Sequence, residues 1–476
     1  MMKKRLTLAV ITVILAVICA APVAAWAEVD YIVDYNYDDP IQPIPQTYVL
    51  EHTISYLGEE FGTLSAPQDL YVAADDTLYI ADSGNNRILR FDANYQPVQQ
   101  VAGEGDATLY NPQSVYADEY GGIYVADTGN NRIVKFSKAG KYVEEFGTPK
   151  SDVLAKDFVM SARRVSVSST GYLYVIRNQY VMQMDAYNNF RGYISVNDVG
   201  FDLWYKIRQL LSTEKQKYSM QKREPASCLS FDVSTDGTLY VTTAETSGQL
   251  KKISSISKNI YPKKDVFGAT VMVDGVAHTP YFVDLAVAQN DTVFMLESWG
   301  GEVHVYDAEG NNLTVFGGIG ESADEFTNPI AVDTDSRGYV YVLDAASNCV
   351  KVFAPTHFMN MVLDAVALYS EGKYVEAVEY WEAISAIDAN YSLANKGFAK
   401  AYYKQKEYKL AMEYYELCND RSGYSEAFTK YRLEMLRQHF GWVLLAAAVL
   451  LVAVILIIKY FMCWIARVIR RYYNKI

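Results

Sequence analysis

The sequence is poor in the two residue types that most often bind metals or form cross-links. Of its 476 residues, five are cysteine and five are histidine. The cysteines are widely spaced single residues without a CxxC pair, so they indicate neither a disulfide framework nor a zinc site. We expect Cys228, Cys349 and Cys418 to be small buried thiols. The histidines form no HExxH or other short metal-binding spacing. GxSxG, P-loop and dinucleotide-binding motifs are also lacking, so we predict no metal, no cofactor and no catalytic residue.

Positive charge is scarce as well. The chain has 43 lysine and arginine residues against 56 aspartate and glutamate residues. Three of the basic residues lie in the first five positions and five more lie at or beyond position 459, which leaves 35 basic against 56 acidic residues between them. Such a surface repels phosphates and anionic lipid headgroups, so we exclude nucleic acid as a partner.

The first 27 residues have the pattern of an export signal. Lys3, Lys4 and Arg5 precede an uncharged apolar run, Leu6–Ala21, and Ala25-Trp26-Ala27 is a small-x-small cleavage pattern. We predict a signal peptide over residues 1–27, with an uncleaved N-terminal anchor as the alternative. In both cases the domain that follows is exported.

A second apolar stretch, Gly441–Ile458, is long enough to cross a bilayer as a helix. We predict a transmembrane helix over residues 440–466, rather than a buried core helix, and a basic cytoplasmic tail over residues 467–476. Positive charges after the span place the tail in the cytoplasm and the rest of the chain outside a cell membrane that it crosses once. The residues expected to anchor this span are Trp442, Lys459, Trp464, Arg467, Arg470 and Arg471.

Internal repeats dominate the middle of the chain. APQDLYVAADDTLYIADSGNNRILRF (Ala66–Phe91) aligns without a gap with NPQSVYADEYGGIYVADTGNNRIVKF (Asn111–Phe136), and Asn328–Phe353 repeats the same frame. Weaker copies begin at Ala162, Cys228 and Tyr281. Each copy has three short runs of alternating apolar residues, and some copies have a fourth. Four strands recurring about every 45 residues predict propeller blades. Six copies predict a six-bladed β-propeller over residues 46–355.

These units resemble NHL repeats, since YIADSGNNRILRF and YVADTGNNRIVKF are close to the hallmark of that family. The third to fifth copies are degenerate, with Arg177, Thr242 and Glu297 in place of the aspartate at 82, 127 and 344. The resemblance implies a platform for binding. Six-bladed relatives include lactonases and lyases with metal-binding side chains around the channel, but no motif of theirs transfers to this sequence.

The ends of the repeat region predict how the ring closes. The sixth copy stops before its fourth strand, and the segment before the first copy parallels Asn312–Pro329. We expect Val49–Leu57 to complete the last blade, after a linker over residues 28–45. Between the third and fourth copies, apolar residues including Trp204 recur at helical spacing, which predicts a helical insertion near residues 198–224. Its apolar stripe either packs on the propeller or docks a partner.

After Pro355 the apolar period changes to that of helices. Tyr369, Tyr374 and Ala377 recur 34 residues later as Tyr403, Tyr408 and Ala411, a spacing similar to that of tetratricopeptide repeats. We predict two such repeats over residues 356–439, with Ser425–His439 as a capping helix. Aromatic residues crowd these helices, and we leave packing and partner binding equally open for them. They are Tyr380, Trp381, Tyr402, Tyr403, Tyr414 and Tyr415.

Two polar features recur at one blade position. We expect Asp82, Asp127 and Asp344 to bond turn backbone rather than a metal, and Gly84 and Asn85 to supply the positive φ of a hairpin. Arg87 and Arg132 follow these turns, and we favour a structural role for them over contact with an acidic partner.

Together these features predict a multidomain β + α protein: a propeller, a short helical array and one membrane span. The predicted function is a membrane-anchored extracytoplasmic binding or scaffold protein, accessory to a transport or envelope assembly. Its expected partner is a protein at the membrane, with a glycan or small ligand as alternatives. The competing hypotheses are a tethered propeller enzyme of lactonase or lyase type and a cell-wall spacer without a specific partner.

Overall fold

The computed structural model describes residues 31–34, 42–155, 157–194, 227–254, 257–262, 266–273 and 275–473. These residues belong to two compact units, Met1–Ser370 and Glu371–Ile476. The predicted signal peptide and the insertion with Trp204 lie outside the described residues.

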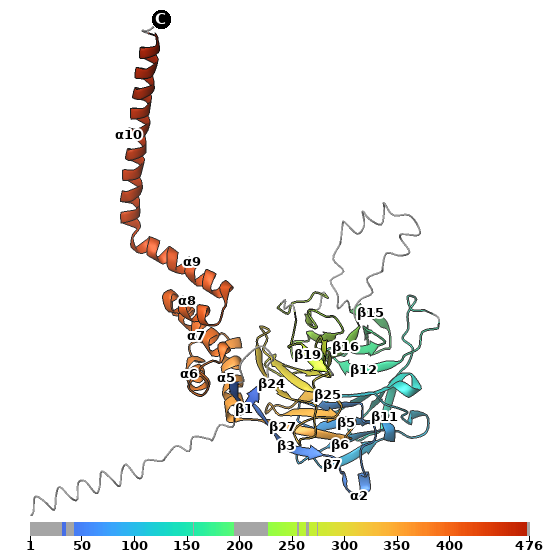
Figure 1. The fold of residues 1–476 in the computed structure, drawn as a ribbon. Helices are drawn as coiled ribbons and strands as arrows, with labels where there is room; N and C mark the ends of the chain where they lie inside the picture. Colours follow the sequence, from blue (N-terminus) through green and yellow to red (C-terminus); the bar gives the residue numbers. More distant parts are fainter. Residues whose placement is uncertain are drawn as a thin grey trace, which may run out of the picture. The chain divides into compact units, whose positions relative to one another are not determined.

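The first unit is built on six antiparallel sheets, one for each sequence repeat (Figure 1). The predicted six-bladed propeller is therefore confirmed. Blade 1 contains β4 (Asp69–Val72), β5 (Leu78–Asp82), β6 (Arg87–Phe91) and β7 (Pro97–Val101). Blade 2 contains β8 (Ser114–Ala117), β9 (Ile123–Asp127), β10 (Arg132–Phe136) and β11 (Tyr142–Phe146). Blade 3 contains β12 (Ala162–Val167), β13 (Leu173–Arg177), β14 (Tyr180–Met184) and β15 (Phe190–Ile194).

The remaining blades follow the same order from the innermost strand outward. In blade 4 the described strands are β16 (Cys228–Val233), β17 (Leu239–Thr243) and β18 (Leu250–Ile253). Blade 5 contains β21 (Phe282–Val287), β22 (Val293–Glu297), β23 (Glu302–Tyr306) and β24 (Asn312–Gly317). Blade 6 contains β25 (Pro329–Thr334), β26 (Val340–Asp344), β27 (Cys349–Pro355) and β3 (Tyr48–Ile54).

The membership of β3 in blade 6 confirms the predicted ring closure. β3 pairs antiparallel with β27, from Tyr48 opposite Pro355 to Ile54 opposite Val350. The strand begins one residue before, and ends three residues before, the predicted segment. Tyr48 is only 3% exposed, and its ring stacks on Phe316 of blade 5 at a centroid distance of 4.3 Å. The N-terminal strand therefore both fills the last sheet and packs against the preceding blade.

The second strand of most blades is buried along its whole length. All five residues of β5, β9, β22 and β26 are buried. Such strands are covered on both faces because each blade packs against its two neighbours, so their first four residues are apolar in succession rather than alternating, and only the last is acidic. Apolar clusters lie between successive blades, for example Leu78, Ile80 and Leu89 of blade 1 with Leu343 and Val350 of blade 6. Cys228 and Cys349 belong to this buried interior, as predicted, whereas Cys418 is half-buried.

Smaller elements were not foreseen in the sequence. The segment predicted as a linker contains β1 (Tyr31–Asp34) and β2 (Gln42–Pro45), which pair antiparallel. A second hairpin, β19 (Val271–Val273) with β20 (Val276–His278), precedes blade 5. A short helix, α2 (Gly58–Phe61), follows β3. The helix α5 (His357–Ser370) also belongs to the first unit, where Leu363 approaches Gly338 of blade 6.

The second unit is helical. It contains α6 (Val378–Ile387), α7 (Ser392–Lys404), α8 (Tyr408–Leu417), α9 (Arg421–Gln438) and α10 (Phe440–Tyr473). The expected capping helix corresponds to α9, which begins four residues earlier because the Asp420 carboxylate accepts a hydrogen bond from the Gly423 amide at 2.9 Å. Two glycines allow close helix packing. A Cβ on Gly397 would lie 2.2 Å from the Trp381 indole, and one on Gly423 would lie 2.3 Å from the Tyr415 ring.

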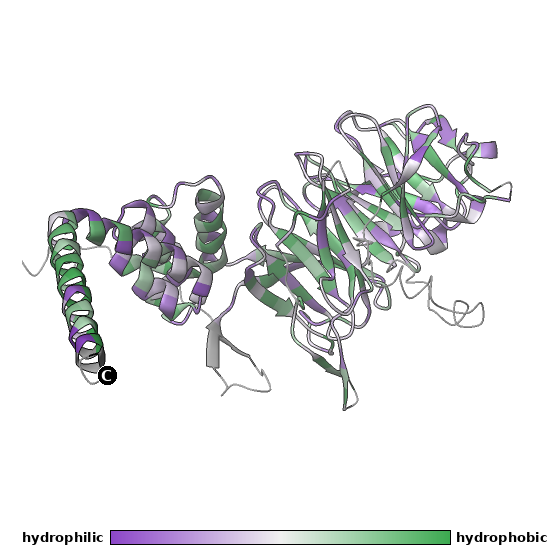
Figure 2. Cartoon of the chain, turned by 90° about the horizontal axis from the view of Figure 1, so that it is seen from above, coloured by the Kyte–Doolittle hydropathy of each residue, from purple (hydrophilic) through white to green (hydrophobic). Residues whose placement is uncertain are grey.

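The helix α10 carries the long apolar stretch. Its segment Phe440–Arg467 is long and apolar enough to cross a membrane, and Figure 2 colours most of α10 as hydrophobic. The side chains of its most apolar window are not buried by protein. Trp442 and Trp464, at the two ends of the stretch, are 73% and 50% exposed. Lys459 and Arg467 lie within the segment, and Arg470 and Arg471 follow on the same helix.

Candidate functional site: the propeller channel

The innermost strands of the six blades line a central channel with two layers of side chains. We name the first layer the first channel ring: Asp69, Ser114, Arg164, Ser230, Asp284 and Ala331. These residues occupy the same position in each of the six repeats: each lies nine residues before the first residue of the second strand of its blade. Two residues further along each strand lies the second channel ring: Tyr71, Tyr116, Ser166, Asp232, Ala286 and Asp333. Residues two apart on a strand face the same side, so both rings face the channel.

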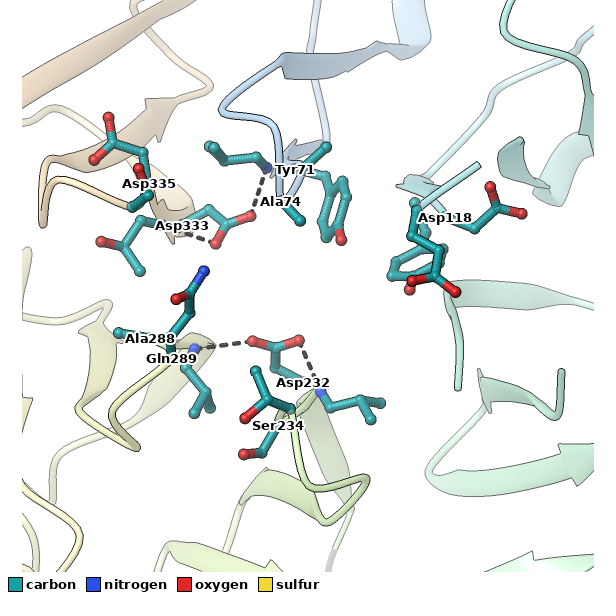
Figure 3. A pocket seen from close by; sticks show the side chains of 18 of the residues that line it. Tyr71, Ala74, Asp118, Asp232, Ser234, Ala288, Gln289, Asp333 and Asp335 are labelled. Atoms are coloured by element: carbon teal, nitrogen blue, oxygen red, sulfur yellow. Dashed lines mark hydrogen bonds between the residues drawn. The ribbon is translucent and has the colours of Figure 1, made fainter. Parts of the chain in front are cut away.

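Several ring residues tie neighbouring blades together through backbone amides. Asp284 accepts a hydrogen bond from the Val332 amide of blade 6 at 2.9 Å, and Asp69 accepts one from the Val115 amide of blade 2 at 3.2 Å. In the second ring, Asp333 accepts from the Val72 amide at 2.7 Å and Asp232 from the Val287 amide at 2.8 Å (Figure 3). An innermost strand is the edge of its sheet and has unpaired N–H groups, and these carboxylates satisfy some of them.

Arg164 is the one basic residue in the two rings. Its Nη1 lies 2.5 Å from Oδ1 of Asp284 and 3.6 Å from Oδ1 of Asp69. These partners belong to blades 5 and 1, so the guanidinium of blade 3 reaches across the channel. Ser230 donates a further hydrogen bond to Oδ1 of Asp284 at 2.6 Å. Burial would lower the pKa of Arg164, but the charges of Asp284 and Asp69 outweigh it and raise the pKa.

A cavity of about 820 Å³ occupies the channel at the level of the second ring. Its wall consists of the ends of the innermost strands and the turns that follow them in all six blades, together with α5 residues such as Leu363 and Asp364. Tyr71, Tyr116, Asp232 and Asp333 belong to this wall. Figure 3 shows the carboxyl groups of Asp232 and Asp333 projecting into the cavity from separate blades. This volume lies in the range of small-molecule sites in proteins.

The carboxyl groups around the channel outnumber the basic groups. Burial raises the pKa of Asp69 to about 6 and that of Asp232 to about 6. Burial, together with the charge of Asp232, also raises the pKa of Asp333 well above its usual range. Arg164 lowers all three values but does not compensate for the burial. Asp69 and Asp232 therefore titrate near pH 6, above the range of an ordinary aspartate.

Two tyrosines form an aromatic part of the cavity wall. The rings of Tyr71 and Tyr116 lie 4.9 Å apart at an angle of 47°. The Tyr116 hydroxyl donates to the backbone carbonyl of Val167 in blade 3 at 2.8 Å. Burial raises the pKa of Tyr116 to about 12 and that of Tyr71 well above its usual range, so both hydroxyls stay protonated at neutral pH. They offer neutral hydroxyls and π-faces rather than a catalytic base.

Within the described part of the chain, no group of three or more His, Cys, Asp or Glu residues is placed to hold a metal ion. The carboxylates of the two rings are directed mainly to backbone amides of the next blade. The arrangement is suited to holding the ring together and to presenting negative charge to a ligand in the cavity.

The opposite end of the blades contains the polar feature that the sequence did predict. Asp82 accepts hydrogen bonds from the Ser65 amide at 2.8 Å and from Nε of Arg87 at 2.8 Å. Asp127 repeats both contacts with Tyr110 and Arg132. Asp344 bonds the amides of Thr327 and Asn328. The predicted bonding to backbone is confirmed, but most of these amides belong to the segments before the innermost strands and not to the hairpin turns. Glu297, in a degenerate copy, takes the same role by accepting from the Tyr281 and Gly300 amides.

The turn itself differs from the prediction. The positive φ values fall on Asn86 and Asn131, at 54° and 56°, and not on Gly84 or Asn85. Gly84 is needed instead for a close approach, because a Cβ there would lie 2.6 Å from the Ser65 carbonyl oxygen. The guanidinium groups of Arg87 and Arg132 also donate to backbone carbonyls of the preceding loop. This arrangement agrees with the structural role that we favoured for them, and contact with an acidic partner stays a prediction.

The aromatic residues of the helical unit divide between the core and the surface. Trp381 and Tyr415 are buried, at 1% and 4% exposure. Tyr402 and Tyr414 stack at 5.4 Å and are half-buried, as are Tyr380 and Tyr403. Tyr403 also donates to Glu426 of α9 at 2.6 Å. Packing explains Trp381 and Tyr415, and partner binding by the half-buried members stays a prediction.

The channel rings were missed in the sequence. Their members are separated by tens of residues, and only ring closure brings Asp69, Arg164 and Asp284 together. A signal was nevertheless present: when the six copies are aligned, charged residues occur on one face of innermost strands that are otherwise apolar.

Comparison with known proteins supports the repeat assignment. Residues 64–91 and 109–136 match the model of the NHL repeat. The chain contains NHL repeats. A search of curated protein sequences finds no match.

Solved structures with a similar chain path are propellers. A streptogramin B lyase covers 65% of this chain and 98% of its own at 12% identity, with a TM-score of 0.40. A virginiamycin B lyase from Staphylococcus aureus covers 64% and 99% at 10% identity, with a TM-score of 0.38. A putative gluconolactonase covers 62% and 89% at 10% identity, with a TM-score of 0.39. At this level of similarity, the likeness says nothing about the chemistry of the channel.

Proposed function

We propose that this protein is a membrane-anchored extracytoplasmic binding protein, with a ligand site at the channel mouth of the propeller. The observation that carries the proposal is the cavity of about 820 Å³, which all six blades line. A site contributed by every blade is a common use of a propeller, because turns from distant parts of the sequence meet there on a rigid scaffold.

The anchor in this proposal is α10. Its apolar segment is 28 residues long, and its most apolar window is not buried by other parts of the protein, which supports a bilayer as its environment. The basic residues Arg467, Arg470, Arg471 and Lys475 favour a cytoplasmic C-terminus. The propeller and the helices would then lie outside the cell, in agreement with the export signal inferred from residues 1–27.

The helices α6–α9 would serve as a second contact module. The 34-residue period and the pairing of helices through Gly397 and Gly423 support a tetratricopeptide-like array. Two repeats form a short array, and its half-buried tyrosines are suited to a protein partner at the membrane. An accessory role in a transport or envelope assembly follows from this architecture by analogy.

One observation favours the alternative of a tethered lactonase- or lyase-type enzyme. The pKa of Asp232, raised to about 6, suits a general base near neutral pH. Against this alternative, both Asp232 and Asp333 already accept backbone hydrogen bonds from the neighbouring blades. Binding is therefore the function that the channel supports best.

The proposal is tested by photocrosslinking in native membranes with a pair of positions in blade 2. Tyr120 lies in the turn between β8 and β9, next to the cavity, and is 83% exposed. Tyr110 precedes β8 at the opposite end of the blade and is 60% exposed. A photoreactive residue at position 120 should capture a specific ligand or partner that the same residue at position 110 does not. Equal capture at both positions, or none at either, would contradict a site at the channel mouth.

A further inference from the structure

The two channel rings differ in the groups that contact their carboxylates. In the first ring, the carboxylates of Asp69 and Asp284 lie 3.6 Å and 2.5 Å from the Arg164 guanidinium. In the second ring, Asp232 and Asp333 receive backbone N–H groups only, and no basic side chain of the described residues lies within 4 Å of either carboxylate. Among the described residues, the channel therefore pairs one layer of carboxylates with a cation of its own, whereas the next layer faces a cavity without an ion pair, and Arg164 acts on it only from a longer distance.

The rest of the cavity wall is suited to an organic cation. Acidic residues outnumber basic ones in it, and the two basic residues, Lys135 and Arg337, are already paired with Glu144 and Asp335. The tilted rings of Tyr71 and Tyr116 add π-faces beside the carboxylates, and such faces attract ammonium groups. A bare metal ion fits less well, because no three acidic, His or Cys side chains of the described chain are placed to hold one.

We propose that the channel-mouth cavity binds the ammonium group of an organic amine, which Asp232 and Asp333 hold by charge and Tyr71 and Tyr116 by their rings. This inference rests on the proposed function and gives it a ligand class. The amine is either a free small molecule or the lysine side chain of a peptide, since both present the same group. The cavity of about 820 Å³ has room for either.

The test is isothermal titration calorimetry of the full-length protein in detergent micelles. The probes are 1,5-diaminopentane, a peptide with one central lysine, 1-hexanol as a neutral molecule of similar length, and Ca²⁺ alone. We expect an amine to bind and 1-hexanol not to bind. Binding of 1,5-diaminopentane without the peptide would identify a small amine, and binding of the peptide without 1,5-diaminopentane would identify a lysine side chain.

The variants are a matched pair within blade 6. Asp333→Asn keeps an oxygen that can accept from the Val72 amide but removes the charge, and we expect a loss of about tenfold to a hundredfold in amine affinity. Asp344→Asn makes the same change in a buried, backbone-bonded aspartate at the opposite end of the blade, and the affinity should be unchanged. Thermal unfolding verifies that both variants are folded.

A further readout needs no variant. Amine affinity of the unaltered protein should rise between pH 5 and pH 7, as the carboxyls that face the ligand ionise. The other charged groups that act on these carboxyls are Arg164 and Asp284. The remaining charged residues of the cavity wall are Asp76, Asp118, Glu119, Glu144, Asp335, Asp364, Lys135 and Arg337.

Several results would overturn the inference: equal binding of 1-hexanol, binding of Ca²⁺ alone with loss in Asp333→Asn, equal losses in both variants, or no binding of any probe. Its failure is distinguishable from failure of the proposed function, because crosslinking at Tyr120 but not Tyr110 would still locate a ligand of different chemistry at the channel mouth.

Discussion

At the scale of single residues, the propeller uses aspartate for two kinds of contact. Asp82, Asp127 and Asp344 bond the backbone of the segments that lead into the innermost strands, and these aspartates could be recognised because they recur within the visible repeat. The channel aspartates at 69, 232, 284 and 333 connect neighbouring blades, and they alternate between the two rings from blade to blade. Their positions are equivalent only in pairs, so no single recurring motif marks them in the sequence.

The channel carboxyls should make stability depend on pH. Burial raises the pKa of Asp69 to about 6 in the folded protein, against 3.8 for an ordinary aspartate. The folded state therefore binds more protons than the unfolded state between about pH 4 and pH 6, and stability falls as pH rises through this window. For Asp69, which faces Arg164, Asp284 and Ser114, we expect a gain of about 1 kcal/mol when the pH falls from 7 to 5.

The measurement is chemical unfolding of the full-length protein at pH 7 and pH 5, with Asp69→Asn as the comparison. In Asp69→Asn, the gain in unfolding free energy between pH 7 and pH 5 should be smaller by about 1 kcal/mol. Hydrogen bonds from Asn189 lower the pKa of Asp185 to about 2. Asp185 therefore affects stability only below about pH 4, outside the range from pH 5 to pH 7 that is compared here. An identical pH dependence in the two proteins would contradict the assignment.

At the scale of elements, the blades were predicted well because alternation, turn residues and a 45-residue period all indicate the same sheets. The strands β4–β6 and β8–β10 fall within the two copies that match the NHL repeat. The hairpins β1–β2 and β19–β20 were missed, since they belong to no repeat and are too short for periodicity to be visible. The start of α9 was also misplaced, because the capping role of Asp420 was not recognised.

The closing strand β3 allows a direct test at this scale. Tyr48 is 3% exposed and packs on Phe316 and Phe294 of the neighbouring blade. Tyr48→Ala should therefore lower the free energy of unfolding of the propeller by about 3 kcal/mol, since it removes a buried aromatic side chain. Tyr56→Ala is the control, because Tyr56 follows the same strand but is 67% exposed, and its effect should stay within about 0.5 kcal/mol. Similar effects in urea unfolding would show that β3 does not hold the ring closed.

At the scale of the whole molecule, the order of modules was visible in the sequence because each module has its own apolar pattern. Apolar residues recur every two residues in the blades and about every 3.6 residues in the helices, and they form an unbroken run in α10. The boundary between the compact units was less visible. The helix α5 follows the propeller directly and belongs to its unit, although its sequence already has the helical pattern. Pattern marks where an element type changes, whereas packing decides to which unit the element belongs.

The orientation of the chain can be measured in intact cells. We expect a protease added from outside to digest the propeller and the helices, and to leave an epitope tag placed after Ile476 protected, because the basic residues after the apolar segment favour the cytoplasm. Permeabilised cells provide the control, in which the tag should be lost. Loss of the tag in intact cells would indicate the opposite orientation and contradict the extracytoplasmic proposal.

The pairing of β3 with β27 also has a consequence for the time course of synthesis. Tyr48 leaves the ribosome about 300 residues before its partner Pro355. At typical elongation rates of about 5 to 20 residues per second, the first strand waits roughly 15 to 60 s for its partner. During that interval blade 6 is absent, blade 1 has no neighbour on one side, and an apolar strand is exposed. The nascent chain therefore has a long interval in which a chaperone can bind it. The propeller can fold as one cooperative unit only after its last strand has emerged.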